Sequence, residues 1–499
     1  MSNLSELLPA GGAAKEFEPV ASGTLPNGQT VVLKSNGQVE AVGESSTSIS
    51  ESIPATTASF ESTEVKGTSV AFDPNTSGKF VVVYRNAGNS NYGTSIVGQV
   101  SGTSISFGTE VIFNSGYTSE PAMAFDPNNA NKFAVVYRND SNADYGEIIV
   151  GTVSGTSISY GSVVVFNSAS VNVPDISFDP NTSGKCVVVY KDNGSSGQGV
   201  SRIGTVSGTS ISFGSEVIFE SQGVEKTKVS FDSKTANKFV IISRESNFLK
   251  GKAVVGTVSG TSCSYGSSVM FNNAETNYPS IASDPNTAGK FIVSYRDDGN
   301  SDYGTAQVAT VSGTSISFGT AVVFNSGFST SWGSVAFDSN TVNKFVIAYS
   351  YYNGGGLGGV SVGTVSGTSI SFGSGIVFNS AGTAFISTDF DPNNSGKFII
   401  SYQTGVAPEF GKVVLGQIAT TITTTNLTST NFVGITAEAI TSGATGVVVP
   451  QGGVATNLSS LTIGSEYYVQ ANGTVSTVST SPAVNIGKAI SATSLILKG

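Results

Sequence analysis

Short stretches of alternating and continuous apolar residues, separated by turns rich in glycine, serine and asparagine, run along most of this chain. One unit shows the pattern. Ser69–Phe72 is a short apolar stretch, and Lys79–Arg85 is apolar on both faces, as in a strand that is covered on both sides. Thr94–Val100 and Ser104–Phe113 follow as two further strand-like stretches. The pattern therefore predicts four β-strands in each unit.

The same unit returns seven times. A Phe-Asp pair, or a close variant of it, recurs with its aspartate at Asp73, Asp126, Asp179, Asp232, Asp284, Asp338 and Asp391, so the period is 52 to 54 residues. A Thr-Ser-Ile-Ser signature, with cysteine replacing isoleucine once, begins at Thr47, Thr103, Thr156, Thr209, Thr261, Thr314 and Thr368. Four strands repeated at this period are typical of a β-propeller. A solenoid is the alternative.

The two signatures are out of phase at the ends of the array, which favours a closed ring over a solenoid. Thr47–Ser50 resembles a fourth strand without its first three, whereas Val413–Ile418 resembles a third strand without a complete fourth. We therefore expect the N-terminal strand to complete the seventh blade. Thr421–Thr424 is an alternative closing strand. An open solenoid would instead need capping repeats.

The segments outside the ring resemble each other. Leu33–Val42 and Val469–Val478 each consist of two short strands around Asn-Gly, a strong hairpin signal. Asn431–Thr441 could include one helical turn. Since ring closure brings both ends of the array together, we expect residues 1–46 and 424–499 to form one small discontinuous β-domain. The fold class is thus all-β, with a seven-bladed propeller over 47–423 inserted in that domain.

Composition narrows the functional classes. The net charge of −10 argues against nucleic-acid binding, because such a surface repels phosphates. No apolar run is long enough to cross a membrane, and the first residues lack the features of a secretory signal. Cys186 and Cys263 take the places of apolar residues in non-equivalent strands, so we expect them to be buried and unpaired.

The loops of a propeller lie on two faces, and the repeats differ on only one of them. Turns between strands one and two and between strands three and four are monotonous, with Pro-Asn-Thr-Ser-Gly and Val-Ser-Gly-Thr recurring. The loops between strands two and three and between blades differ from copy to copy. Variable loops on a uniform scaffold are where recognition is usually built. We expect both flanking segments on the uniform side and a binding surface on the variable face.

Aromatic and acidic residues that break the repeat are the candidate ligand contacts, since repetition does not explain them. Aromatic rings with nearby carboxylates suit sugar stacking and hydrogen bonding. The candidates are Tyr117, Tyr278, Phe328, Trp332, Tyr351, Tyr352, Asp144 and Asp302.

Other chemistry is less well supported. Asp73 and its counterparts are interpreted as turn caps and not calcium ligands, although Asp140 with Asp144, and Asp297 and Asp298 with Asp302, could bind calcium weakly. Cations recur after strand two, at Arg85, Arg138, Lys191, Arg244 and Arg296; salt bridges or packing are favoured over an anionic glycan. The chain has no histidine, and no nucleophile and base stand together. We therefore expect no enzyme activity, no cofactor and no metal site.

The flanks resemble tail-fibre and structural proteins of marine tailed phages, and more faintly the small domains of head-decoration proteins. The resemblance covers about 120 residues in short, glycine-rich motifs: Leu7–Gly12, Gly28–Leu33, Asn36-Gly37, Phe432–Ile440, Gly464–Gln470 and Gly487–Thr493. It implies a virion component, with the flanks attached to other virion proteins and the middle displayed. It implies no catalytic residues.

The sequence thus predicts a non-enzymatic phage protein of the tail-fibre or capsid-decoration type at the virion surface, made in the host cytoplasm. Its propeller is expected to bind a glycan or protein of the bacterial surface. Alternatives are a glycan-degrading propeller enzyme of the virion and a bacterial surface adhesin. Tail or head location and homo-oligomerisation remain open.

Overall fold

The computed structural model describes residues 16–353, 355–405, 407 and 409–499. The chain divides into two compact units, one made of residues 50–420 and the other of the segments before and after them. Leu7–Gly12, part of the phage-like motifs, lies outside the described residues. Within the part that the structure describes, no helix is long and apolar enough to span a membrane.

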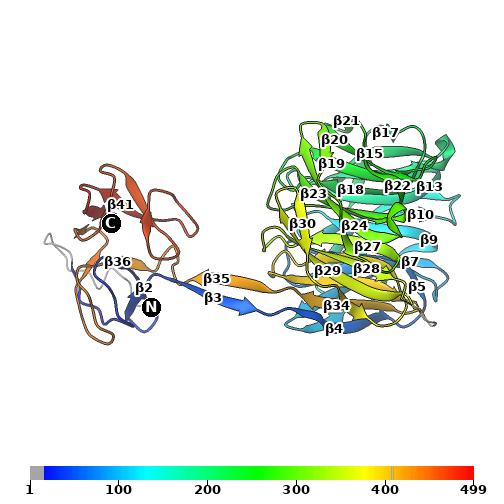
Figure 1. The fold of residues 1–499 in the computed structure, drawn as a ribbon. Coiled ribbons are helices and arrows are strands. Elements are labelled where there is room, and N and C mark those ends of the chain that lie inside the picture. The colour runs from blue at the N-terminus through cyan, green and yellow to red at the C-terminus, as the bar shows by residue number, and fades with distance from the viewer. Residues whose placement is uncertain (1–15, 354, 406, 408) are drawn as a thin grey trace. The chain divides into compact units, whose positions relative to one another are not determined.

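Each repeat folds into a four-stranded antiparallel blade (Figure 1). In the first blade, β5 (Val65–Phe72) pairs with β6 (Lys79–Asn86), which pairs with β7 (Tyr92–Ser101). The outer edge of β7 pairs with both β8 (Ser104–Phe107) and the start of β9 (Val111–Phe125). The described residues 50–420 form seven such blades, so this unit is a seven-bladed β-propeller.

The remaining strands of the propeller follow the same order. They are β10 (Lys132–Asn139), β11 (Tyr145–Ser154), β12 (Ser157–Tyr160), β13 (Val164–Phe178), β14 (Lys185–Asp192), β15 (Gln198–Ser207), β16 (Ser210–Phe213), β17 (Val217–Glu220), β18 (Val224–Phe231), β19 (Lys238–Glu245), β20 (Lys250–Ser259), β21 (Ser262–Tyr265), β22 (Val269–Ser283), β23 (Lys290–Asp297), β24 (Tyr303–Ser312), β25 (Ser315–Phe318), β26 (Val322–Asn325), β27 (Thr330–Phe337), β28 (Lys344–Tyr351), β29 (Leu357–Ser366), β30 (Ser369–Phe372), β31 (Ile376–Asn379), β32 (Thr383–Phe390), β33 (Lys397–Thr404) and β34 (Gly411–Gln417). Two short 3-10 turns, Asn193–Ser195 and Asp298–Asn300, follow β14 and β23.

Three segments that the sequence predicts as loops between blades are strand. Tyr117–Pro121 lies within β9, Val171–Pro174 within β13 and Glu275–Pro279 within β22. Each of these strands is 15 residues long, begins on the outer edge of one blade and continues as the inner strand of the next. The variation between copies therefore falls on inner strands as well as on loops.

The ring is closed by β4 (Ser52–Glu61), which pairs antiparallel with β34 and supplies the fourth strand of the seventh blade. The prediction that Thr47–Ser50 is this strand is wrong, and so is the alternative Thr421–Thr424. The register is set by a phenylalanine packed where only glycine leaves room. A Cβ on Gly411 would lie 2.4 Å from the Phe60 ring, as one on Gly93 would lie 2.3 Å from Phe113.

Thr47 precedes Phe60 by 13 residues, whereas Thr103 precedes Phe113 by 10. The local match of Thr47–Ser50 to the signature is therefore out of register with the blade. These residues lie at the end of β3 (Glu44–Ile49), which pairs with β35 (Thr420–Thr425) as a separate two-stranded ribbon. Two hydroxyl pairs, Ser45 with Thr424 and Ser46 with Thr423, lie across it at 3.0 Å each.

The repeated aspartates join neighbouring blades. One carboxylate oxygen caps its own turn, as predicted; the Asn75 N–H donates to Asp73 at 3.0 Å. The other oxygen accepts an N–H from the next blade, as between Gly78 and Asp391 across the closure (2.9 Å). Equivalent bonds join Gly184 to Asp126, Asn237 to Asp179, Gly289 to Asp232 and Gly396 to Asp338. All seven aspartates are at most 1% exposed, so burial strengthens these contacts.

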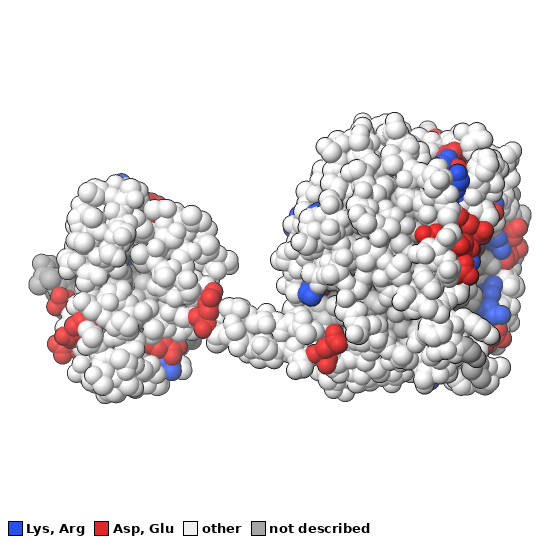
Figure 2. Space-filling view, in the orientation of Figure 1, with Lys and Arg blue, Asp and Glu red and all other residues white. Residues whose placement is uncertain are grey.

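The two faces of the propeller differ in the way the repeats predict. The turn after β5 and the hairpin after β7 lie together, since the Val100 N–H donates to the Gly78 carbonyl (2.8 Å). We call this the uniform face. The chain enters and leaves the ring there, because Ser52 pairs with Gln417 and the Gln417 amide donates to Ser395 in such a turn (3.2 Å). Figure 2 shows charged side chains gathered at one end of the propeller, whereas the rest of its visible surface is largely uncharged.

The second unit consists of two small sheets. The first has the order β2-β1-β36-β37, and the second has the order β38-β42-β41-β39-β40. The strands are β1 (Thr30–Leu33), β2 (Val39–Ala41), β36 (Phe432–Thr436), β37 (Val448–Pro450), β38 (Val454–Ala455), β39 (Glu466–Val469), β40 (Val475–Ser476), β41 (Val484–Ala489) and β42 (Leu495–Leu497). Both Asn-Gly hairpins form, with β1 on β2 and β39 on β40. The suggested helical turn in Asn431–Thr441 is wrong, because β36 occupies this segment.

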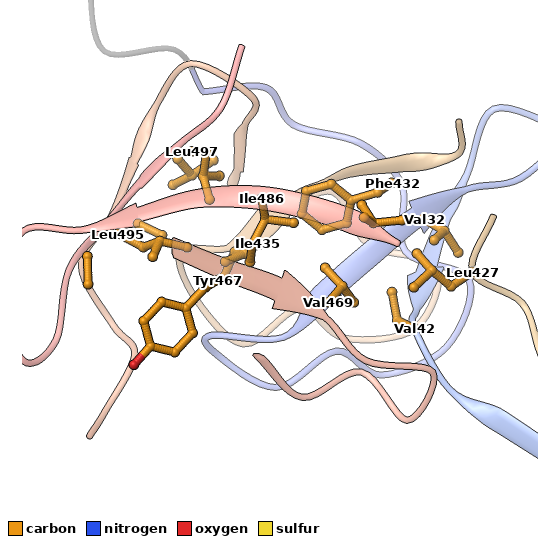
Figure 3. Close-up of a cluster of buried hydrophobic side chains, with 14 of the residues drawn as sticks. Val32, Val42, Leu427, Phe432, Ile435, Tyr467, Val469, Ile486, Leu495 and Leu497 are labelled. Atoms are coloured by element: carbon orange, nitrogen blue, oxygen red, sulfur yellow. The ribbon is translucent and has the colours of Figure 1, made fainter. Parts of the chain in front are cut away.

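Both ends of the chain contribute to one core in this unit (Figure 3). Val32 and Val42 from the N-terminal segment pack with Phe432, Val469 and Leu495 from the C-terminal segment, all at most 3% exposed. The Thr30 hydroxyl also donates to the Gly473 carbonyl (2.6 Å). The segments before and after the propeller therefore form one discontinuous β-domain, into which the propeller is inserted.

The two cysteines are buried and free. Cys186 lies in β14 and Cys263 in β21. Burial raises the pKa of the Cys186 thiol to about 12, so the thiol stays protonated and unreactive at neutral pH. Both residues serve as small apolar side chains, as the repeat predicts.

The Asp389 carboxyl, at the junction of the seventh and first blades, predicts a pH-dependent stability. It accepts the Phe72 N–H (2.8 Å), and burial raises its pKa to about 7. Between the unfolded pKa of about 3.9 and this value, the folded chain holds a proton that the unfolded chain releases, so the free energy of unfolding falls as pH rises. We expect Asp389→Asn to remove this loss, making the variant more stable than wild type at pH 8 by on the order of 3 kcal/mol.

Thermal unfolding of both proteins between pH 4 and pH 8 measures the effect. Burial also raises the pKa of Glu110 to about 7, but Glu110 contributes the same slope to both proteins. The difference between them therefore isolates Asp389. Parallel pH profiles would contradict the assignment.

Candidate functional site

The inner strand of each blade carries a β-bulge. In the first blade the register between β5 and β6 shifts between Lys66 and Ser69, and the residue at the bulge, Gly67, has φ +60°. The equivalent residues in the other blades are also left-handed: Glu120 (φ +51°), Val173 (+47°), Lys226 (+55°), Tyr278 (+49°), Trp332 (+53°) and Phe385 (+50°). We call these seven residues the mouth ring.

The mouth ring combines a fixed backbone with changing side chains. A left-handed conformation costs a residue other than glycine about 1–2 kcal/mol, and it is rarest for bulky or β-branched side chains such as Trp332 and Val173. Such strain persists only where the surrounding structure holds it, and it gathers at functional sites. Here neighbouring blades hold it: the Thr68 hydroxyl donates to the Phe385 carbonyl (2.5 Å), and the Thr227 hydroxyl to that of Val173 (2.6 Å).

All seven side-chain positions line one cavity of about 430 Å³. Its remaining wall comes from adjacent residues of the inner strands and from two arginines of the second strands, Arg85 and Arg138. Pro121, Pro174 and Pro279 each follow a mouth-ring residue and lack an N–H, which suits them to a bulge. The cavity is polar on one side and aromatic on the other.

Three consecutive members of the ring form an aromatic arc. The ring of Trp332 lies 5.1 Å from that of Tyr278 and 4.3 Å from that of Phe385, centroid to centroid. The Arg296 guanidinium lies 5.5 Å from the centroid of the Tyr278 ring. All three aromatic residues are partly exposed in the cavity. A planar or ring-shaped ligand could therefore stack on them.

Cations dominate the charge of the cavity wall. Lys66, Arg85, Arg138, Lys226 and Lys228 line it, against one acidic residue, Glu120. Three of these cations pair with carboxylates beside the cavity: Lys66 with Glu64 (2.8 Å), Arg138 with Asp140 (2.6 Å) and Lys228 with Asp175 (3.1 Å). The hydrogen bonds to Glu64 and to Asp140 raise the pKa of Lys66 and of Arg138 respectively.

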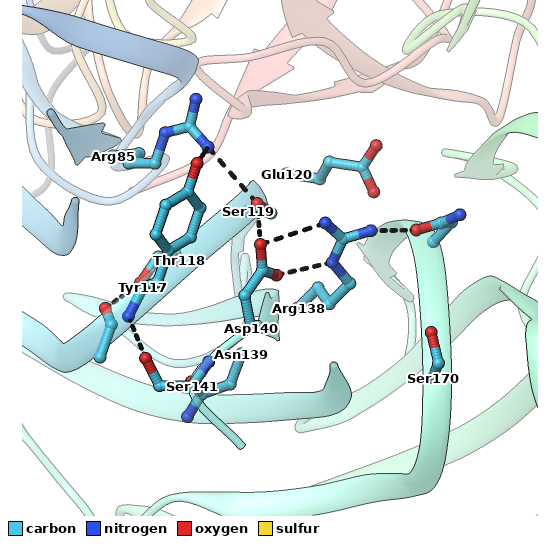
Figure 4. Close-up of polar contacts among 12 residues, drawn as sticks. Arg85, Tyr117, Thr118, Ser119, Glu120, Arg138, Asn139, Asp140, Ser141 and Ser170 are labelled. Carbon is cyan, nitrogen blue, oxygen red and sulfur yellow. Dashed lines mark hydrogen bonds and ion pairs between the residues drawn. The ribbon is translucent and has the colours of Figure 1, made fainter. Parts of the chain in front are cut away.

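Arg85 is held by neutral groups. Its guanidinium lies 5.1 Å from the centroid of the Tyr117 ring and donates to the Tyr117 hydroxyl (3.1 Å) and, more weakly, to that of Ser119 (3.4 Å). The Ser119 hydroxyl donates to Asp140, which pairs with Arg138, so the two arginines are connected through one polar network (Figure 4). The arginine side chains are therefore positioned before any ligand arrives.

The structure brings only some of the predicted ligand residues together. Tyr278 and Trp332 line the cavity, and Tyr117 packs beside it on Arg85. Phe328 and Tyr351 pack on each other at the strand-two-to-three side of the sixth blade (5.6 Å), where Tyr352 is 71% exposed. None of these last three residues is among the described residues of the cavity wall.

Asp144 and Asp302 occupy equivalent turn positions. Both are left-handed, with φ +61° and +60°, and their carbonyls accept N–H bonds from Val171 and Thr330 (3.0 and 2.9 Å). Their repetition is thus explained by the turn between the second and third strands. Among the described residues, no group of three or more acidic residues or cysteines is arranged to hold a metal ion.

The recurring cations after the second strand have several partners. Arg138 and Arg296 each pair with an aspartate two residues later, at 2.6 Å, and Arg244 pairs with Glu225 and Glu275. These contacts agree with the salt-bridge interpretation of that row. Arg85 differs from them, as described above.

Sequence reasoning missed most of the mouth ring. Glu120, Val173, Lys226 and Phe385 belong to it but were not candidates, and neither was Gly67. The available signal was positional: Glu120 and Val173 directly precede Pro121 and Pro174, as Tyr278 precedes Pro279. Alignment of the repeats on the Phe-Asp pair would have placed the seven residues in one column.

Comparison with known proteins adds the fold. No known protein family matches this sequence, and no curated protein matches it. Among solved structures, the BP39L lectin from Burkholderia pseudomallei is similar with a TM-score of 0.54 and 8% identity, over 72% of this chain and 99% of that one. The similarity is one of fold alone.

Two further structures are more distant. Sqt1 from Chaetomium thermophilum, bound to the N-terminus of the ribosomal protein L10, has a TM-score of 0.46 and 10% identity, over 72% of this chain and 98% of that one. AofleA from Arthrobotrys oligospora has a TM-score of 0.42 and 8% identity, over 71% and 96%.

The strained backbone of the mouth ring predicts opposite effects of two substitutions at equivalent positions. Val173→Gly relieves a left-handed valine, which offsets the extra flexibility of glycine in the unfolded chain, so its melting temperature should stay equal or rise. Gly67→Val introduces the same strain and places a Cβ 3.3 Å from Pro121, so we expect a loss of about 1–2 kcal/mol. Thermal unfolding of both variants measures this. A lower melting temperature for Val173→Gly than for Gly67→Val would contradict it.

Proposed function

We propose that this protein is a non-enzymatic display protein that binds a carbohydrate in the mouth-ring cavity of its propeller. The observation that carries the proposal is the aromatic arc of Tyr278, Trp332 and Phe385 in one cavity with hydrogen-bonding side chains. Sugar rings present apolar faces that stack on aromatic rings, and their hydroxyls need polar partners around the rim.

The size of the cavity supports a small ligand over a large protein surface. About 430 Å³ lies within the usual range for small-molecule sites and would hold one or two sugar rings. Specific protein–protein interfaces instead bury about 800 Å² on each partner. The Burkholderia pseudomallei protein that shares the fold is described as a lectin, which agrees with this proposal.

We further propose that the protein belongs to the surface of a phage virion, with the discontinuous β-domain as its attachment module and the propeller as the displayed module. The phage-like motifs of the flanks motivate this role. The insertion of the propeller in the β-domain also supports it, because the chain enters and leaves the ring at the uniform face and keeps both connections away from the mouth. Gold-labelled antibody against the propeller should decorate purified particles of the phage that encodes this chain; unlabelled particles would contradict the role.

Two aromatic substitutions in the same blade test the carbohydrate site. Trp332→Ala removes the centre of the aromatic arc, whereas Phe328→Ala removes an exposed ring outside the cavity wall. Since stacking on one aromatic ring contributes about 1–3 kcal/mol, we expect Trp332→Ala to weaken binding to glycan-array hits at least tenfold and Phe328→Ala to leave it within twofold. Equal losses, or a loss only in Phe328→Ala, would move the site to the outer loops. The release of fragments from a bound glycan would contradict a purely binding role.

A further inference from the structure

Two cations of the cavity wall have no carboxylate partner among the described residues. Arg85 contacts Tyr117 and Ser119, and its Nε is buried without a hydrogen-bond partner in the described part of the chain. Lys226 is exposed at the bulge of β18 and forms no ion pair with any described residue. The other three cations of the wall are each neutralised by an adjacent acid.

These two cations lie beyond opposite ends of the aromatic arc. Around the ring, Lys226 immediately precedes Tyr278, where the arc begins. Phe385 ends the arc and is followed by Gly67, which adds no side chain to the mouth. Arg85 lines the cavity from β6, since it pairs with Lys66, the residue before Gly67. A ligand stacked on Trp332 would thus have a free cation toward either end.

The electrostatics of the cavity contrast with those of the whole protein. The chain has a net charge of −10, yet the cavity wall holds five cations and one acid. Even Glu120 is engaged, because its carboxylate accepts the Val173 N–H at 2.5 Å. A positive site in an acidic protein attracts anions locally while the remaining surface repels them. Its attraction is therefore directed at a small charged group and not at a long polyanion.

Arg85 is suited to such a group. Tyr117 and Ser119 fix its guanidinium, and the connection through Ser119 and Asp140 ties it to Arg138 (Figure 4). A planar guanidinium that is already in place loses little entropy when it binds a carboxylate or phosphate, and such charge-assisted bonds are about twice as strong as neutral ones.

We infer that the ligand of the mouth-ring cavity is an acidic saccharide, that is, a sugar ring that stacks on the aromatic arc and carries a carboxylate or phosphate bound by Arg85 or Lys226. This inference rests on the proposed carbohydrate binding and specifies its chemistry. Lys226 and Arg85 act as specificity-determining residues, whereas the aromatic arc binds the sugar ring whether or not it is charged.

Matched saccharide pairs test the inference with the full-length protein. Trigalacturonic acid and its methyl ester differ in charge but share their sugar rings, as do phosphorylated and unphosphorylated mannopentaose. Titration calorimetry at low ionic strength should show at least one acidic member binding about tenfold or more tightly than its neutral partner, as expected for a charge-assisted bond.

Two charge reversals provide the matched comparison. Lys226→Glu places at this bulge the residue that Glu120 already supplies in the second blade, so the fold tolerates it. Lys234→Glu makes the same change in net charge at an exposed turn after β18, outside the cavity wall. We expect Lys226→Glu to weaken binding of the acidic saccharide about tenfold and to leave the neutral one within twofold, with Lys234→Glu changing neither by more than twofold.

The outcomes separate the two proposals. Equal affinity for both members of each pair, with both lost in Trp332→Ala, would overturn the acidic specificity and leave carbohydrate binding intact. An effect of Lys234→Glu as large as that of Lys226→Glu would also overturn it, since the attraction would then come from net charge alone. Failure of every pair together with a blank glycan array would overturn carbohydrate binding as well.

Discussion

The pairing of β4 with β34 is the interaction on which the rest of the propeller depends. It joins Glu61 to Gly411, which are 350 residues apart in sequence, and so turns a row of seven blades into a ring. Phe60 packs over Gly411 at this closure just as Phe113 packs over Gly93 within an ordinary blade. Two carboxylates on the seventh-blade side secure the same junction, because Asp389 accepts the Phe72 N–H and Asp391 that of Gly78. A closed ring needs no capping repeat, since it leaves no free blade edge.

Closure also creates the site. A bulge in one inner strand would only displace one side chain, but seven of them around an axis converge on a common cavity. The scaffold is uniform because the glycine–phenylalanine pairs and the buried aspartates recur, whereas the residue at each bulge differs. Recognition chemistry can therefore change at these seven positions without changes in the blades. That separation explains how strained residues such as Trp332 are retained: strong packing elsewhere outweighs a local cost of about 1–2 kcal/mol at each position.

The repeat made the blade architecture predictable, but not the details that make it a site. Seven Phe-Asp pairs at a constant period determine the number of blades, because each period is long enough for four strands. The closing strand was misplaced because Thr47–Ser50 matches the outer-strand signature, while the true register depends on Phe60 packing over Gly411, a contact that only tertiary structure reveals. The Asn-Gly hairpins at Asn36 and Asn472 were predictable, since their turn chemistry is local.

The mouth ring was harder to predict for a physical reason. Left-handed backbone is normally signalled by glycine, asparagine or aspartate, yet here tryptophan, valine and phenylalanine adopt it under tertiary constraint. Trp332 and Tyr278 were recognised only because they break the repeat. Arg85 belonged to a row of cations that looks uniform in sequence, and its different environment became visible only when Tyr117 and Ser119 were seen to replace an acidic partner. Local sequence therefore indicated the variable face but not its centre.

Hydrogen–deuterium exchange with and without a bound saccharide most directly tests the claim that ring closure gathers the bulges into one recognition site. The account predicts slower exchange at the bulges of several blades at once, in the segments around Lys226, Tyr278, Trp332 and Phe385, with little change in the outer loop at Tyr351 and Tyr352. Protection confined to the outer loop of a single blade would contradict it.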